Sequence, residues 1–564
     1  MDWPKYFNVH AKVAAGSAPS SGPHVGTGVH LPTLLLPLLL LPPSPWSPAA
    51  TAEAGRILAV PVDGSHWMGM KTLLLELTRR GHTITVLRSS TTLFVDETSD
   101  DFHIENIPAK TVITREEGLA MAERWILDVA FAPPSTFFST ISSTLAMARA
   151  MAGMASDMAV AIEKTLGDGA LMSRLRDARF DAVLADTFYP GGPMVARALG
   201  LPVALLGRWE VGGDVHLQLA PAPLSYVPAL DSRYSDHMGF AQRLDNFIRY
   251  WSAYALNRAL VFPTFDRLCE RYLGADVSYE QLYQRADVVL LKIDFVLEYP
   301  RPTMPNFVYV GGLQCREARP LAGELAALYA GAGPHGVIVA SFGSLVSSLP
   351  PRVAEEVARA FARLPQKVVW RHAGPRPPGL GDNTLLLPWL PQNDLLAHGA
   401  TRAFVSHGGE GGVYEAIRHG VPLLGLPMYG DQHDNVARLV ERGAALSLSG
   451  RLHALTSDEF LAPLRRLLDE PRFGEAMRRL SLMHRDTPVP PLDLAAFWVE
   501  FLARNGGAAH LRVAGLEMPA YRRCSLDVLL ALLLALVAAA AVGALMLVRV
   551  KRWLCQSDER PKRE

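Results

Sequence analysis

Short apolar runs of strand length alternate with stretches of helical spacing, and this alternation restricts the chain to α/β folds. Residues 56–62 (RILAVPV) form such a run, residues 68–80 follow with apolar side chains at helical spacing, and residues 83–87 (TITVL) alternate as a strand does. A strand, a helix and another strand in this order predict a parallel sheet. Residues 181–185 and 202–206 are expected to add further strands to it.

A second series of the same kind begins beyond residue 330. Its expected strands are residues 336–341, 367–370, 403–406 and 422–426, with helices over 353–364 and 413–419. The pattern therefore predicts two Rossmann-like halves that face a cleft. Open parallel sheets bind ligands beyond the carboxyl ends of their strands. Four polar residues fall at such ends: His66, Asp186, Ser344 and His407.

The charge and the cysteines of the 564-residue chain exclude several classes of protein. Lys plus Arg and Asp plus Glu both number 55, so the net charge gives no electrostatic reason to expect a nucleic-acid partner. The four cysteines form no C-x-x-C pair, which leaves zinc and redox motifs unsupported. Only Cys269 and Cys315 lie in the main body, and the sequence leaves open whether they are bonded.

Both ends of the chain carry membrane signals. Residues 528–548 contain no charge and are long enough for one transmembrane helix. Arg549, Lys551 and Arg552 follow at once, so the tail is expected in the cytoplasm and the body on the luminal side. At the other end, the leucine-rich residues 31–41 precede an A-x-A-like site at residues 50–52, a pattern typical of a signal peptide. A leader with a buried apolar patch is the alternative.

Five segments carry a family resemblance: residues 389–396 (WLPQNDLL), 404–409 (FVSHGG), 414–417 (YEAI), 422–427 (PLLGLP) and 430–435 (GDQHDN). Together they resemble the donor-site signature of the UDP-glucuronosyltransferases. Residues 64–68, 180–186, 305–315, 497–501 and 510–512 match the same family, so the resemblance extends from about residue 56 to the end.

The resemblance implies an α/β chain of the GT-B class, with two Rossmann-like domains that face a cleft and a terminal membrane helix. The expected division is a leader with a signal peptide (1–54), an acceptor-binding domain (55–300), a UDP-sugar-binding domain (301–510), a membrane-proximal segment (511–527), the transmembrane helix (528–548) and a basic cytoplasmic tail (549–564). It also implies residence in the membrane of the endoplasmic reticulum.

Residue types at the expected donor site suit a UDP-sugar, and the resemblance assigns their roles. Free amides at a helix N-terminus bind phosphate, and glycines let the backbone come close. The assigned residues are Ser344, His407, Gly408 and Gly409 for the diphosphate, Trp389 for stacking on uracil, Gln392 and Glu415 for base and ribose, and Asp431 and Gln432 for the sugar. Without the resemblance, Trp389 would more often be a buried core residue, and Glu415 would be a solvated carboxylate on a helix.

His66 and Asp186 are the expected catalytic pair. A neutral imidazole can remove the proton of an acceptor hydroxyl. A carboxylate on its other nitrogen fixes the tautomer and stabilises the imidazolium. These roles come from the resemblance; without it, His66 could cap a helix and Asp186 could be a turn carboxylate.

One departure from the family pattern affects the donor site. The family usually has Asn where this chain has Gly411, and here Glu410 adds a carboxylate that would repel phosphate unless it points away. This departure motivates an alternative in which the chain is a catalytically silent membrane protein that binds ligands or other subunits. The sequence also contains no D-x-D motif, which usually holds the divalent metal in the other large glycosyltransferase fold, so no metal is expected. The resemblance implies no cofactor either, because the UDP-sugar is a co-substrate.

The acceptor half is less informative. Met147, Met151, Met154 and Met158 stand at helical spacing, which suits either a permissive apolar surface or a buried helix face. The expected activity is inverting transfer of glucuronic acid from UDP-glucuronic acid to small lipophilic acceptors. UDP-glucose, UDP-N-acetylglucosamine and UDP-galactose are alternative donors. Expected partners are these substrates, the membrane and further subunits through small residues in the span, but no nucleic acid.

Overall fold

The structure is a computed structural model that describes residues 54–558, apart from 90, 91, 93, 108–114, 132–136, 212 and 451. The expected signal peptide therefore lies outside the described residues.

The first sheet has seven parallel strands in the order β3-β2-β1-β4-β5-β8-β9. They are β1 (Arg56–Val60), β2 (Thr83–Ser89), β3 (His103–Ile107), β4 (Ala182–Asp186), β5 (Val203–Gly207), β8 (Val288–Leu291) and β9 (Phe307–Tyr309). Strands β4, β5 and β8 are buried along their whole length, which explains their continuous apolar sequences. The strand order reverses between β1 and β4, the position at which open sheets bind ligands.

The second sheet has six parallel strands in the order β12-β11-β10-β13-β14-β15. They are β10 (Val337–Ser341), β11 (Lys367–Arg371), β12 (Thr384–Leu387), β13 (Thr401–Ser406), β14 (Leu423–Gly425) and β15 (Ala445–Ser447). Here the order reverses between β10 and β13. The expected strands of both halves are thus confirmed, and we call the two halves the first and the second lobe.

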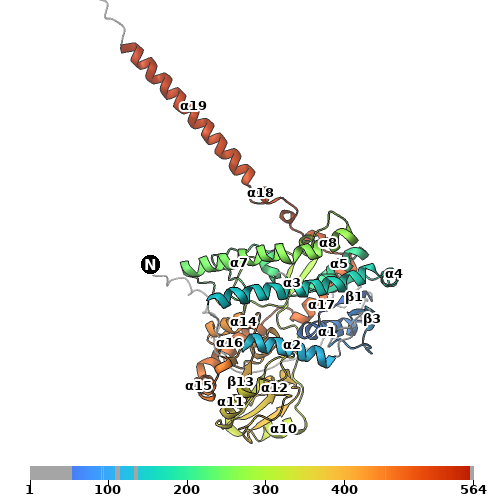
Figure 1. The fold of residues 1–564 in the computed structure, drawn as a ribbon. Coiled ribbons are helices and arrows are strands. Elements are labelled where there is room, and N and C mark those ends of the chain that lie inside the picture. Colours follow the sequence, from blue (N-terminus) through green and yellow to red (C-terminus); the bar gives the residue numbers. More distant parts are fainter. Residues whose placement is uncertain are drawn as a thin grey trace, which may run out of the picture. The chain divides into compact units, whose positions relative to one another are not determined.

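Helices cover both sheets (Figure 1). In the first half of the chain they are α1 (Ser65–Arg79), α2 (Arg115–Ala130), α3 (Phe137–Gly167), α4 (Gly169–Asp177), α5 (Gly191–Leu199), α6 (Val215–Leu219), α7 (Phe240–Leu260), α8 (Phe262–Leu273) and α9 (Tyr279–Gln284). In the second half they are α10 (Gly323–Ala330), α11 (Pro351–Ala362), α12 (Gln392–Ala397), α13 (Glu410–His419), α14 (Gln432–Glu441), α15 (Ser457–Asp469), α16 (Pro471–Arg485) and α17 (Pro491–Asn505).

Three elements cross the division expected at residue 300. Strand β9 pairs with β8 of the first sheet, and helix α17 returns to pack on α1, β4 and β5. In the other direction, α2 packs on the second lobe (Figure 1). Its Ile126 is buried in the core of that lobe, and its Glu123 accepts the N–H groups of Ser347 (2.6 Å) and Ser348 (2.9 Å). The lobes therefore exchange elements as well as facing each other.

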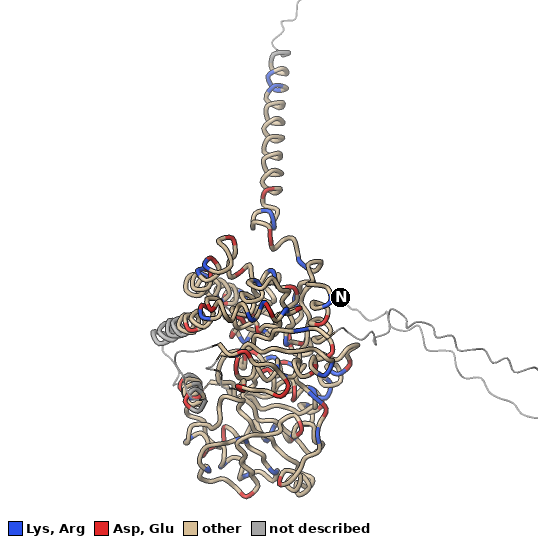
Figure 2. The backbone as a smooth tube through the Cα atoms, turned by 90° about the vertical axis from the view of Figure 1, so that its right-hand side faces the viewer, with Lys and Arg blue, Asp and Glu red and all other residues tan. Residues whose placement is uncertain are grey.

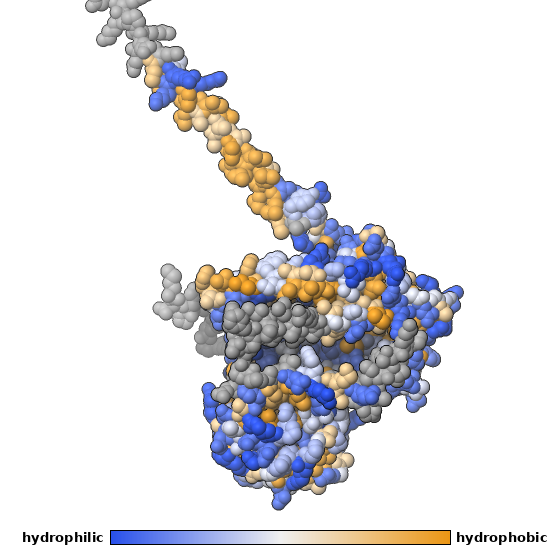
Figure 3. All heavy atoms as spheres, viewed as in Figure 1, coloured by the Kyte–Doolittle hydropathy of each residue, from blue (hydrophilic) through white to orange (hydrophobic). Residues whose placement is uncertain are grey.

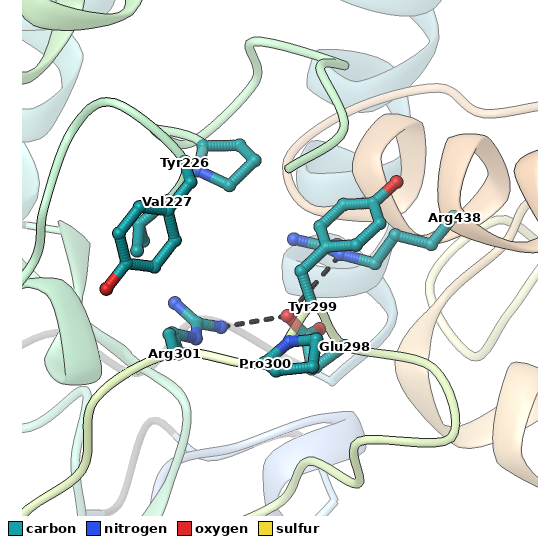
Figure 4. Close-up of a pocket in the computed structure, with 8 residues that line it drawn as sticks. Tyr226, Val227, Glu298, Tyr299, Pro300, Arg301 and Arg438 are labelled. Carbon is teal, nitrogen blue, oxygen red and sulfur yellow. Dashed lines mark hydrogen bonds and ion pairs between the residues drawn. The ribbon is translucent and has the colours of Figure 1, made fainter. Parts of the chain in front are cut away.

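A buried group of charges joins the lobes on the side of α14 (Figure 4). Glu298 of the first lobe is paired with Arg208 (2.6 Å), with Arg301 (2.8 Å) and with Arg438 of α14 (3.4 Å). Burial alone would raise the pKa of Glu298, but the three guanidinium groups hold it well below its usual value. Asp434 of α14 strengthens the junction by accepting the N–H of Asp231 (2.8 Å).

Helix α19 (Leu526–Asp558) contains the expected membrane span. Residues Leu526–Cys555 are long and apolar enough to cross a membrane, and none of the span is buried within the structure. Figure 2 shows the helix without charged residues along its middle and with basic residues near its far end. The span is thus a candidate anchor in the structure as well as in the sequence.

Candidate active site

His66 and Asp186 meet at the reversal point of the first sheet. Gly64, with φ of 72°, turns the chain into α1, and His66 is the second residue of that helix. Asp186 ends β4, the strand beside β1. The Nδ1 atom of His66 lies 2.9 Å and 3.1 Å from the two carboxylate oxygens of Asp186. The N–H of Phe188 also donates to Asp186 (2.8 Å), which holds the carboxylate in place.

This contact defines the protonation of the imidazole. An ionised carboxylate can only accept, so Nδ1 carries the proton and Nε2 is left with its lone pair. Burial lowers the pKa of His66, but the charge and the hydrogen bond of Asp186 outweigh it and raise the pKa above 6.5. His66 is still partly exposed, so a hydroxyl group can reach Nε2. The pair can act as a general base.

An ion pair across the lobes stands beside His66. Lys292 follows β8, and its Nζ lies 3.1 Å from Oε1 of Glu410, the first residue of α13. A Cβ at Gly69 of α1 would come within 3.1 Å of the same Nζ, so the glycine leaves room for the lysine. Both charges act on His66: Lys292 lowers its pKa and Glu410 raises it. Glu410 thus turns toward the first lobe.

The glycine-rich turn after β13 packs around His407. Added Cβ atoms at Gly343 and Gly409 would lie 2.6 Å and 2.4 Å from its Nε2, so the imidazole fills the space between two stretches of backbone. Burial, with a smaller contribution from Arg371, lowers the pKa of His407 to about 4, and the ring is neutral at physiological pH. Gly408, with φ of 82°, lies against Val436 of α14, where a Cβ would approach to 2.4 Å.

Trp389 presents a large free surface. Its side chain is 54% exposed, and the guanidinium of Arg371 lies 5.0 Å from the centre of its ring. Arg371 also donates to the carbonyl groups of Val346 (2.8 Å) and Ser344 (3.3 Å). A single arginine therefore supports the aromatic side chain and holds the loop that contains Ser344. An exposed aromatic face beside such a loop can stack on a base.

Gln392 and Glu415 form a polar pair next to the turn. Gln392 begins α12 and donates from Nε2 to Glu415 of α13 (2.6 Å). Burial raises the pKa of Glu415 to about 7, against the effect of that hydrogen bond. The two residues expected to hold base and ribose are therefore in contact.

Asp431 and Gln432 lie at the N-terminus of α14. Asn435 donates to Asp431 (2.8 Å), and burial raises the pKa of Asp431 although Arg208 opposes the shift. The side-chain oxygen of Gln432 accepts the N–H groups of Met428 (2.9 Å) and Tyr429 (3.2 Å). The side-chain oxygen of Gln432 is thus already used within the chain.

Among the described residues, one group of side chains has the spacing of metal ligands: Asp236, His237 and Glu441. It belongs to the loop before α7 and the C-terminal end of α14, whereas the expected donor residues lie at the N-terminal end of that helix. Cys269 and Cys315 are both free thiols, which answers the question left open by the sequence.

The comparisons with known proteins identify the family. Residues 55–560 match the family model described as "UDP-glucoronosyl and UDP-glucosyl transferase". The chain belongs to this family. Among curated members of the UDP-glycosyltransferase family, it is 38% identical over 496 residues to UDP-glucuronosyltransferase 2A3 of Mus musculus, covering 87% of this chain and 91% of the relative. It is also 38% identical over 514 residues to UDP-glucuronosyltransferase 1A5 of Homo sapiens, covering 90% and 92%.

Solved structures of more distant proteins share the fold. A UDP-glucosyltransferase from Polygonum tinctorium matches with a TM-score of 0.54 and 19% identity, over 80% of this chain and all of that one. UGT2 of Phytolacca americana, complexed with UDP-2fluoro-glucose and pterostilbene, matches with a TM-score of 0.53 and 19% identity, over 80% and 99%. These likenesses confirm the expected GT-B fold, with two parallel sheets in Rossmann-like lobes.

Gly411 stands where the family resemblance leads us to expect an asparagine, and the space next to its Cα is open. A Cβ at Gly411 would meet one atom within 4 Å, Nε2 of Gln314 at 3.8 Å. That nitrogen donates to the carbonyl of Gly411 (3.4 Å), while the buried Oε1 of Gln314 has no hydrogen-bond partner. The site therefore has room for a Cβ at position 411 and an unused acceptor nearby.

Lys292 and Arg371 are site residues that the sequence reasoning missed. Each comes at the carboxyl end of a strand, Lys292 after β8 and Arg371 as the last residue of β11. The rule that placed His66 and Asp186 at the site applies equally to them. Basic residues are common after strands, so that position alone gave no reason to choose them.

Proposed function

We propose that this UDP-glycosyltransferase transfers glucuronic acid from UDP-glucuronic acid to a hydroxyl group of small lipophilic acceptors. The observation that carries the proposal is the His66–Asp186 pair beside the first residue of α13, where a diphosphate would bind. The names of the two curated relatives favour glucuronic acid as the sugar.

In the proposed reaction, Nε2 of His66 removes the hydroxyl proton of the acceptor as its oxygen attacks the anomeric carbon. The bond from that carbon to the diphosphate oxygen breaks, the configuration inverts, and UDP leaves with the electron pair. Asp186 stabilises the imidazolium that forms. General-base assistance of this kind contributes about 10²–10⁴-fold to the rate.

The chain's own amides receive the negative charge of the leaving group in this proposal. The N-terminus of α13 offers unpaired N–H groups and the positive end of the helix dipole, so the reaction needs no metal and no cofactor. Ser344, Gly408 and Gly409 would bind the diphosphate, Trp389 would stack on uracil, and Gln392 with Glu415 would hold the ribose. Asp431 and the amide nitrogen of Gln432 would bind the sugar.

Transfer assays in membranes that contain the full chain test the proposal. Labelled UDP-glucuronic acid is offered with a panel of phenols, and UDP-glucose, UDP-N-acetylglucosamine and UDP-galactose are compared as donors. We expect glucuronides from the wild type and a loss of at least about 100-fold in His66→Ala. A neutral sugar preferred over glucuronic acid would overturn the donor assignment.

A second candidate function is that of a catalytically silent binding partner, which Glu410 and Gly411 favour. The same assay separates the two. A silent protein would bind the phenols and form no product from any of the donors, although it is inserted in the membrane. Gly411→Asn would then be the variant in which to look for recovered UDP release.

A further inference from the structure

Helix α7 carries an apolar stripe that faces outward. Five side chains recur at spacings of 4, 7, 8 and 11 residues and thus share one face, and each is between 48% and 74% exposed: Phe240, Leu244, Phe247, Ile248 and Trp251. Figure 3 shows the apolar colour gathered over α7 on the surface of the molecule. We call these five residues the α7 stripe.

The lobe holds α7 by its polar side. The helix has 21 residues, and its one buried residue is Asn246. Asn246 accepts the N–H of Ala229 (2.6 Å) and donates to the carbonyls of Leu224 (3.0 Å) and Val227 (2.9 Å). The hydroxyl of Tyr250 donates to the carbonyl of Leu217 (3.2 Å). A helix on a globular protein normally packs its apolar face inward, so the α7 stripe has no role in the packing of the lobe.

The chain leaves the same part of the first lobe for the membrane. Arg258, near the end of α7, donates to Glu280 of α9 (3.0 Å), and α9 runs directly into Asp287. Asp287 in turn accepts the N–H of Ala508 and a side-chain nitrogen of Arg512, both at 3.0 Å. Thirteen residues separate Arg512 from Leu526, the start of α19. Fully extended, the connection spans at most about 50 Å, so α7 stays within reach of the bilayer.

We propose that the α7 stripe docks on the surface of the lipid bilayer that α19 spans. The stripe has the composition of an interfacial helix, with a tryptophan among aliphatic and phenylalanine side chains. Three arginines and one aspartate give the helix itself a net charge of +2, which the pairing of Arg258 with Glu280 of α9 reduces to +1, and a positive charge suits lipid phosphates: Arg243, Arg249, Arg258 and Asp245. Tyr254, whose ring centre lies 5.8 Å from that of Trp251, adds a side chain that favours the headgroup region. The proposal depends on α19 as an anchor and is independent of the reaction proposed above.

Spin labels on the full chain test this docking. The chain is placed in nanodiscs of phosphatidylcholine and phosphatidylserine, one chain per disc, after Cys315, Cys524 and Cys555 are changed to serine. Cys269 is buried and stays. A label is then attached at Leu244→Cys or Phe247→Cys, with Leu482→Cys on α16 as the matched control because that leucine is also exposed. The measured quantity is collision with oxygen, which dissolves in lipid, relative to a water-soluble nickel chelate.

We expect an oxygen-to-nickel ratio several-fold higher at positions 244 and 247 than at 482. Adding Trp251→Glu and Ile248→Glu to the Leu244→Cys chain should bring its ratio down to that of the control. Equal ratios at all three positions would overturn the proposal. So would a stripe covered by a second copy of the chain, which would show as water-exposed labels in single-chain discs and spin–spin broadening in discs with two chains.

Discussion

The carboxylate of Asp186 sets the pH range in which His66 can act as a base. A base works in its deprotonated form, and Asp186 raises the pKa of His66 above 6.5. The acid limb of the wild-type profile of kcat/KM against pH should therefore lie above pH 6.5. In Asp186→Asn the raising charge is lost, and the acid limb of the profile should move to lower pH. The plateau should fall as well, because the amide no longer favours the productive tautomer. A pH series of kcat/KM for both proteins is the measurement.

An unchanged acid limb in that variant would contradict the assignment, since a purely structural role for Asp186 would lower the plateau alone. Asp63 supplies a control. Asp63 lies on the same strand-to-helix turn, and its carboxylate accepts the N–H groups of Gly64 (3.0 Å) and Phe94 (2.8 Å), whereas the charges that act most on the pKa of His66 are those of Asp186, Lys292 and Glu410. Asp63→Asn should therefore leave the position of the limb unchanged.

Glu410 is expected to oppose the donor. Its carboxylate occupies the N-terminus of α13 and neutralises Lys292, so both features weaken the attraction of a diphosphate. Glu410→Gln should lower the Kd for UDP by about tenfold, since such a charge interaction near a protein surface is on the order of 1.4 kcal/mol. Isothermal titration with UDP measures this without turnover.

Glu317→Gln is the matched control for that experiment. It removes the same charge from an exposed residue that pairs with Arg418 at the other end of α13. The control should leave the Kd for UDP unchanged. A Kd that rises in Glu410→Gln would show that the carboxylate helps to bind the nucleotide.

The family resemblance assigned the roles of the site residues, whereas the rule that parallel strands direct their carboxyl ends to one edge only placed four of them at strand ends. His66 and Asp186 are two of these four, and the structure brings them into hydrogen-bond contact. The direction of a side chain does not follow from its place in the sequence. For this reason neither the Lys292–Glu410 pair nor the internal hydrogen bonds of the Gln432 oxygen could be predicted.

At the scale of elements, α14 links the expected sugar site to the first lobe. Glu298→Gln removes the carboxylate that three arginines share in a buried setting. Uncompensated buried charges cost about 3–5 kcal/mol, so the free energy of unfolding should fall by that amount. Because the pKa of Glu298 is depressed, its contribution is complete above its usual pKa of 4.5 and is lost only as the pH falls toward the depressed value.

Thermal unfolding of the two proteins in detergent at pH 7 measures this loss. Glu441→Gln is the control. It changes an exposed carboxylate at the end of α14, whose partner is the Tyr299 hydroxyl, and should shift the free energy of unfolding by less than about 0.5 kcal/mol. Equal melting temperatures for Glu298→Gln and the wild type would show that the arginines find other partners.

Strands were easier to predict than the exchange of elements between lobes. A buried strand of β-branched and aliphatic residues shows directly in the sequence, as for β4 and β10. The amphipathic sequences of α2 and α17 indicate which face of each helix is covered but not which lobe covers it. Helix α2 packs on the core of the second lobe and α17 packs on α1, and both contacts depend on partners far away in the chain.

For the whole molecule, the orientation in the membrane can be read with a glycan. The sequence contains no N-x-[ST] sequon, so any glycan reports an introduced site. Arg485→Asn creates Asn-Asp-Thr at the exposed end of α16, and a second variant carries a short tail with one sequon appended after Glu564, beyond the span. With a luminal body and a cytoplasmic tail, only the first variant should gain a glycan that endoglycosidase H removes. A glycan on the second variant alone would contradict the orientation expected from the sequence.

The α7 stripe would also change how acceptor concentration should be counted. A body that rests on the bilayer meets lipophilic acceptors at the density they reach in the lipid, not in the surrounding water. Protein-free vesicles added to an assay would then lower the amount of acceptor per unit area of membrane and raise the apparent KM for the acceptor. The apparent KM for the water-soluble donor would stay constant. Substrate preference would depend on oil–water partitioning as well as on the fit of the acceptor to the enzyme.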